Sequence, residues 1–217
     1  GVQDEGVIIV LTDMTVKDFL KELASNSPAP GGGSVSALAG GLSTALVSMV
    51  ARLTAGNGEG PRQDGDVETI LEKAAQLMAD LERDVDDDTA AFNCVMDAYR
   101  LPKQTDQEKE KRSQAIQDAL KGAALHPLKV ARECLHVLRL CRWAVAHGNP
   151  NALSDAGVAS LLAQSGIRGA VYNVEINLSG IRDAEFKERM TAEKEEILTE
   201  ALKLQEEIKE LLHTRLS

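Results

Sequence analysis

Positive charge is scarce in this sequence. Its 217 residues carry 24 lysines and arginines against 34 aspartates and glutamates, which leaves a formal net charge of -10 at pH 7. Nucleic acids and anionic membrane surfaces are bound through basic faces, and a chain with a pI near 4.9 is poorly suited to either. We therefore expect no nucleic-acid partner and no membrane partner.

Paired cysteines and a basic leader are also lacking. Cys94, Cys134 and Cys141 form no C-x-x-C pair and fall in helical stretches, which fits a reduced cytosolic chain better than a disulfide framework. Residues 1–5 do not resemble the basic start of a signal peptide, and no hydrophobic run is expected to reach membrane length. These absences predict a cytoplasmic protein.

No stretch resembles a linker between two domains. A chain of 217 residues is long enough for one domain with a substantial core. We expect a single domain over residues 14–217 and, before it, a tail over residues 1–13 with no assigned function. The apolar run at residues 7–11 is compatible with a strand in that tail.

Helical periodicity covers most of the remaining sequence, with apolar residues recurring at spacings of three and four. His126 and Pro127 are expected to separate two helices, because proline removes a backbone donor. The pattern predicts helices over residues 15–26, 34–54, 66–99, 107–125, 128–147, 154–178 and 183–215. The fold class is therefore all-α, with about six to seven long helices.

One stretch, residues 25–54, differs from the usual sequence pattern of an amphipathic helix. Three consecutive glycines follow two prolines and are followed by a predicted helix of small residues. Ser34 stands where an N-cap is wanted, and the free amides around Gly31, Gly32 and Gly33 form a potential anion site. The loop lacks the Lys-Ser/Thr ending of a P-loop, and no Rossmann strand precedes it. A tight turn with close helix packing is the alternative explanation.

Asp88 interrupts an apolar stripe. Positions 81, 85, 88, 92 and 95 share one helical face, so this carboxylate is expected to point inward. It is either a buried acid paired with a neighbouring helix, or a ligand or catalytic carboxylate. Asp84, Asp86 and Asp87 have no such claim, and we expect them to form a solvated acidic turn.

Two asparagines, Asn173 and Asn177, lie with small residues on one face of a later helix. They either bridge helix backbones or line a pocket that recognises a polar heterocycle. Lys103 sits on a short turn before a capping-box sequence, and sequence physics alone assigns it no role. Glu133 and His136 make a single E-x-x-H step, so we expect no metal site.

Five blocks together resemble the cyclodeaminase/cyclohydrolase family, which includes the cyclodeaminase domain of formiminotransferase-cyclodeaminase and stand-alone bacterial methenyltetrahydrofolate cyclohydrolases. The resemblance covers residues 14–212. The blocks are SPAPGGGSVSALAGGL at 27–42, DDDTAAF at 86–92, LPKQTDQEKEKR at 101–112, GNPNALSD at 148–155 and GAVYNVEINL at 169–178. After Thr54 the chain reads TAGNGEGPRQDG and departs from the family pattern, which puts a folate contact there in doubt.

The resemblance implies an up-and-down helical bundle that binds a reduced folate and assembles as a homodimer or a dimer of dimers. No metal, and no cofactor beyond the tetrahydrofolate substrate, is expected. Asp88 and Lys103 match family positions that we interpret as catalytic. The residues interpreted as substrate-binding are Gly31, Gly32, Gly33, Ser34, Asp155, Asn173 and Asn177.

The expected reaction is hydrolysis of 5,10-methenyltetrahydrofolate to 10-formyltetrahydrofolate. The substrate carries a cationic amidinium, which Asp88 would stabilise or relieve of a proton, with Lys103 as acid or oxyanion partner. The alternative reaction is cyclodeamination of formiminotetrahydrofolate, in which ammonia leaves the same carbon. The chain carries no transferase domain, which favours the hydrolase. A non-catalytic folate-binding protein and a purely structural helical oligomer are the rivals from other classes.

Overall fold

The computed structural model describes residues 10–56 and 67–217, and within them all regular secondary structure is helical, with no strand. This confirms the all-α fold class. The elements are η1 (Leu11–Asp13), α1 (Val16–Leu23), α2 (Gly32–Gly56), α3 (Val67–Arg100), α4 (Asp106–His147), η2 (Pro150–Ala152), α5 (Leu153–Leu178) and α6 (Ala184–Leu216), where η marks a 3-10 helix.

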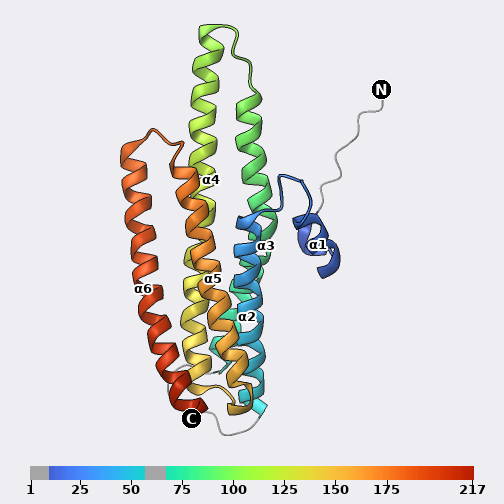
Figure 1. Cartoon of the computed structure of the whole chain (residues 1–217), viewed down its shortest axis with the longest axis vertical. Coiled ribbons are helices and arrows are strands. Elements are labelled where there is room, and N and C mark those ends of the chain that lie inside the picture. Colours follow the sequence, from blue (N-terminus) through green and yellow to red (C-terminus); the bar gives the residue numbers. More distant parts are fainter. Residues whose placement is uncertain (1–9, 57–66) are drawn as a thin grey trace.

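The long helices alternate in direction and form an elongated up-and-down bundle (Figure 1). Helix α4 lies at its centre, because it contacts α2, α3, α5 and α6, whereas α2 packs against α3, α4 and α5. The hairpin of α3 and α4 extends beyond the start of α2 and the end of α5 (Figure 1). Helix α6 lies on the outside, where Arg139 of α4 pairs with Glu200 at 2.8 Å.

The expected break between two helices at His126 and Pro127 is wrong, because α4 continues through Pro127. Proline has no N–H to donate to the carbonyl one turn earlier, which belongs to Ala123. The Asn177 side chain of α5 donates to that oxygen at 2.8 Å. A side chain from another helix therefore satisfies the acceptor that Pro127 leaves open, and two expected helices become one.

The starts of two helices differ from the expectation. Helix α2 begins at Gly32, so Ser34 lies inside the helix rather than at its N-cap. Helix α5 begins at Leu153, one residue before the expected start at 154, and its N-cap residue is Ala152. The capping box of Thr105 and Glu108 at the start of α4 is confirmed, with both reciprocal bonds present.

The N-terminal tail is only partly described. Residues 7–9 of the apolar run at residues 7–11 lie outside the described residues, and Leu11 belongs to η1. The Leu11 backbone amide and the Thr12 hydroxyl both donate to the carboxylate of Asp86. Asp86 therefore holds η1 against α3, which corrects its assignment to a solvated acidic turn.

Helix α2 corrects the expectation about membrane length. The stretch Gly32–Ala55 is long and apolar enough, by length and composition alone, to cross a membrane. Its most apolar window is 56% buried inside the bundle, mainly against α3 and α5. Length and apolar composition are therefore accounted for by its central position, as in the core helix of a bundle.

Gly40 of α2 lies where α2, α3 and α4 approach one another. A Cβ at this position would lie 2.6 Å from the sulfur of Cys134 and 3.0 Å from a methyl carbon of Leu81, both of which are fully buried. Gly41, the next residue, has no such neighbour within 4 Å of its own Cβ position. Close helix packing therefore requires glycine at the first position and not at the second.

We predict opposite effects for two alanine substitutions. Gly40→Ala should lower the free energy of unfolding by about 1–3 kcal/mol, because the added methyl overpacks the core. Gly41→Ala should raise it by up to about 1 kcal/mol, because alanine is the better helix former. Urea unfolding followed by circular dichroism measures both, and equal effects would contradict the packing described for Gly40.

Candidate functional site

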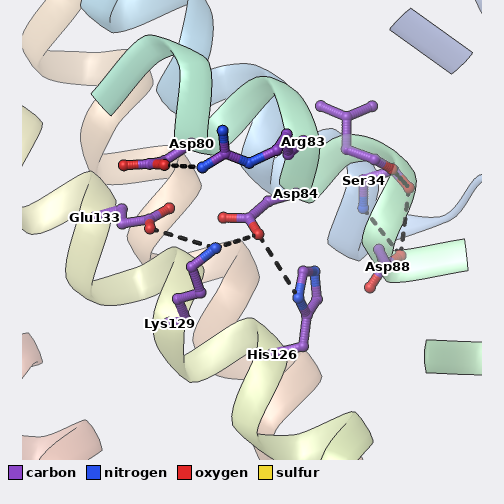
Figure 2. Close-up of polar contacts among 9 residues, drawn as sticks. Ser34, Asp80, Arg83, Asp84, Asp88, His126, Lys129 and Glu133 are labelled. Carbon is purple, nitrogen blue, oxygen red and sulfur yellow. Dashed lines mark hydrogen bonds and ion pairs between the residues drawn. The ribbon is translucent and has the colours of Figure 1, made fainter. Parts of the chain in front are cut away.

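The carboxylate of Asp88 lies at the N-terminus of α2 and binds it from α3. One oxygen accepts from the Ser34 backbone amide at 3.0 Å and from the Ser34 hydroxyl at 3.4 Å (Figure 2). The same hydroxyl donates to the Val85 carbonyl at 2.8 Å. Asp88 points inward as its spacing predicts, and it occupies the place that an external anion would take at this helix end.

Glycine is required beside that carboxylate. A Cβ on Gly33 would lie 2.0 Å from Asp88 Oδ1, which is far inside van der Waals contact. The neighbouring Gly32 faces α5, since its Cβ position lies 3.5 Å from the side-chain nitrogen of Asn173. The glycine loop, Asp88 and Asn173 therefore come together from three helices.

The two asparagines of α5 use their side-chain nitrogens on backbone carbonyls. Asn173 donates to Gly169 at 2.9 Å. Asn177 donates to Asn173 at 2.9 Å and to Ala123 of α4 at 2.8 Å. Bridging of helix backbones, one of the two explanations open from the sequence, is thus present for Asn177.

Lys103 and Asp155 lie far from this group within the chain. Lys103 is exposed in the turn between α3 and α4, and the helix from Asp88 to Arg100 spans about 18 Å at about 1.5 Å per residue. Asp155 lies in the first turn of α5, about 27 Å of helix from Asn173 by the same rise. The connection between α3 and α4 and the start of α5 lie at opposite ends of the bundle (Figure 1).

The sequence analysis missed a cluster of ionisable side chains one turn from Asp88. Asp84 is fully buried, with 0% of its surface exposed, and its Oδ1 lies 2.7 Å from Lys129 Nζ and 3.8 Å from His126 Nδ1. Lys129 also lies 3.5 Å from Glu133 on α4 (Figure 2). The assignment of Asp84 to a solvated turn is therefore wrong, because α4 covers it and supplies partners.

A signal for Asp84 was present in the sequence. Its position is three residues after Leu81 and four before Asp88, which places it beside the buried stripe of α3. Asp87, the remaining member of the acidic run, is exposed as expected.

Burial changes the acidity of the groups around Asp84. Desolvation, followed by the adjacent Asp84 carboxylate, raises the pKa of Glu133 to about 8. Desolvation alone would lower the pKa of Lys129, but its hydrogen bond and charge attraction to Asp84 outweigh it, so this pKa is raised. At neutral pH Glu133 is therefore mostly protonated, and Asp84 is the main counter-charge of Lys129.

Three polar atoms of the cluster are buried and have no hydrogen-bond partner within residues 10–56 and 67–217. They are Asp84 Oδ2, His126 Nε2 and Glu133 Oε2. Unpaired buried polar atoms are uncommon, and their concentration in one place marks a functional candidate.

Metal ligands do not gather in the part of the chain that the structure describes, where no three His, Cys, Asp or Glu side chains form a ligand set. The E-x-x-H step is open to a different explanation. His136 Nδ1 lies 2.9 Å from Arg139, and burial together with that positive charge lowers the pKa of the ring.

Comparison with known proteins gives a consistent result. The protein-family model described as "Formiminotransferase-cyclodeaminase" matches residues 15–196. A methenyltetrahydrofolate cyclohydrolase of Methylorubrum extorquens is 42% identical over 94% of this chain and 98% of its own length. The formimidoyltransferase-cyclodeaminase of Mus musculus is 36% identical over 92% of this chain, which spans only 37% of the mouse protein. The crystal structure of a formiminotetrahydrofolate cyclodeaminase from Thermotoga maritima has a TM-score of 0.81 and 28% identity, covering 94% of this chain and 98% of that one.

Glu133 generates a prediction about stability. Its pKa in the folded chain, about 8, lies above its ordinary value of 4.5, so the folded chain binds this proton more tightly than the unfolded chain does. This contribution to stability is complete below about pH 4.5 and is lost as the pH rises through 8. Between pH 5 and pH 8 we expect the melting temperature of the wild type to fall further than that of Glu133→Gln. Each kcal/mol of folding free energy that is lost should lower the melting temperature by about 2–4 °C.

Glu110, an exposed glutamate of the same helix, supplies the control for that experiment. Glu110→Gln should follow the wild-type melting curve at every pH. Parallel pH dependences for Glu133→Gln and the wild type would show that Glu133 ionises normally.

Proposed function

Because this chain belongs to the formiminotransferase-cyclodeaminase family, we propose that it hydrolyses 5,10-methenyltetrahydrofolate to 10-formyltetrahydrofolate. The observation that carries the proposal is the match to a methenyltetrahydrofolate cyclohydrolase along nearly the full length of both chains. The formimidoyltransferase-cyclodeaminases of Mus musculus and Rattus norvegicus are much longer, since this chain spans 37% of each.

The charge at the loop supports a cationic substrate. Asp88 accepts a hydrogen bond from the Ser34 amide at the start of α2. A carboxylate therefore lies where a helix N-terminus without a partner would present partial positive charge. The amidinium of methenyltetrahydrofolate is a cation, and a carboxylate beside it would stabilise it and the charge that changes as water adds. We assign this role to Asp88, with Gly31, Gly32, Gly33, Ser34 and Asn173 as the surrounding binding residues.

Asn177 supports the same site indirectly. Both hydrogens of its amide nitrogen are engaged by carbonyls, so its side-chain oxygen is the atom offered to a substrate. No metal, and no cofactor beyond the folate itself, is part of the proposal.

Lys103 and Asp155 are included in the proposal only through contacts between subunits. Lys103, in the turn between α3 and α4, and Asp155, in the first turn of α5, both lie too far from Asp88 of the same chain to meet it. We therefore propose that they act across a contact between subunits. Val35, Leu42 and Met49 support a homodimer or a dimer of dimers, because they recur every seven residues on α2 and are 37–50% exposed. A cytoplasmic location remains part of the proposal.

The second candidate activity is cyclodeamination of formiminotetrahydrofolate. The observation that favours it is the similarity in fold to the Thermotoga maritima cyclodeaminase. Both reactions pass through the same carbon, so one carboxylate at Asp88 would suit either. A non-catalytic folate-binding protein is the remaining alternative.

We predict that the purified chain accelerates the loss of the methenyl chromophore near neutral pH, compared with a protein-free control. Asp88→Asn should lower the rate by about 100-fold, because the amide keeps an acceptor for Ser34 but removes the charge. Asp87→Asn is the matched control, since Asp87 is exposed on the same helical turn, and it should retain the wild-type rate.

The other outcomes are separable in the same cuvette. If methenyltetrahydrofolate is not consumed, formiminotetrahydrofolate is added, and appearance of the chromophore with ammonia would identify the cyclodeaminase. Silence with both substrates would reject an enzyme, and a folate titration would then test for a binding protein.

A further inference from the structure

The buried carboxylate of Asp84 lies against an imidazole ring. His126 turns its Nδ1 toward Asp84 Oδ1 at 3.8 Å, and 13% of the His126 side chain is exposed. Its other ring nitrogen, Nε2, is buried and has no partner in the described parts of the chain. A carboxylate on one ring nitrogen and a free second nitrogen is the arrangement by which proteins make imidazole a proton acceptor. A separation slightly beyond hydrogen-bond distance is common before substrate binds.

His126 lies close to the candidate site on two helices. Asp84 is one turn before Asp88 on α3, so residues of adjacent turns hold the imidazole and the start of α2 (Figure 2). On α4, Ala123 lies one turn before His126 and accepts the bond from Asn177. The ring is thus positioned between the α3 turn that carries Asp88 and the α4 turn that meets α5.

We propose that His126, held by Asp84, is the base that takes the proton from the attacking water, directly or through one further water molecule. This inference rests on the proposed function and deepens it, because it assigns a step that neither Asp88 nor Lys103 performs well. Lys103 is at the tip of the hairpin, and one Asp88 oxygen is already bound by Ser34.

The step balances in atoms and charge. The water oxygen bonds to the bridge carbon of the methenyl cation, and one water proton goes to His126 Nε2, which leaves a neutral carbinolamine and an imidazolium. The bond from the bridge carbon to the ring nitrogen of the folate then breaks, and that folate nitrogen takes the proton from the imidazolium. The hydroxyl proton leaves as the formyl C=O forms. One proton is released per turnover, and the imidazole is regenerated.

The charges around His126 suit this cycle. The charged groups drawn with it in Figure 2 are Asp80, Arg83, Asp84 and Asp88 from α3 and Lys129 and Glu133 from its own helix, and Asp80 and Arg83 pair with each other. Asp84 faces the imidazole ring, and Lys129, at 2.7 Å, supplies a counter-charge to the buried Asp84 carboxylate. Glu133, whose pKa burial and Asp84 raise to about 8, adds little negative charge at neutral pH.

The test is the steady-state kinetics of chromophore loss near neutral pH, with kcat and KM measured separately. His126→Gln should lower kcat by at least about 100-fold and change KM less than threefold, because the base is removed while the binding residues remain. Asp84→Asn should lower kcat by about 100-fold, because the imidazole loses the carboxylate that holds it.

His136 provides the matched control, since it lies on the same helix and contacts Arg139 instead. His136→Gln should keep the wild-type kcat and KM, and circular dichroism establishes that each variant is folded. A folded His126→Gln with wild-type kcat overturns the assignment of His126. A wild type that does not consume methenyltetrahydrofolate overturns the proposed function instead, and the proton step with it.

Discussion

The bond between Asp88 and the start of α2 is the constraint on which the candidate site depends. Helix α1 ends at Leu23, and a segment with two prolines separates it from α2, which begins at Gly32. The side-chain oxygen that accepts from the Ser34 amide at the start of α2 comes from α3. Because Gly33 has no side chain, the Asp88 carboxylate can lie in the space that a Cβ would otherwise fill. The result is a negative group at a helix end that ordinarily attracts anions, which is why a cationic substrate centre suits this chain.

A second constraint is the carbonyl that Pro127 leaves without a donor. An unsatisfied buried carbonyl costs about 1–3 kcal/mol, and Asn177 removes that penalty by reaching from α5 to α4. The bond also fixes the level at which the two helices meet. His126 and Asn177 are therefore brought to the same part of the bundle as Asp88 and Asn173.

The buried cluster around Asp84 shows how charge is accommodated inside a bundle of mostly small apolar residues. A buried carboxylate is tolerated only with partners, and Lys129 together with His126 supplies them. The same burial leaves polar atoms with unmet hydrogen bonds and shifts the pKa of Glu133. Stability and proton transfer thus depend on the same few side chains of α3 and α4.

The sequence by itself determined the helices, the inward direction of Asp88 and the unusual glycine loop, because periodicity and backbone freedom are local properties. It did not determine that α4 passes through Pro127 or that Ser34 lies inside α2. Nor did it identify Asp84 as buried or place Lys103 and Asp155 at opposite ends. Those outcomes depend on partners distant in the chain: Asn177 for Pro127, Asp88 for Ser34, and Lys129 and His126 for Asp84. Spacing along a helix shows which face a residue occupies, and only the tertiary structure decides what covers that face.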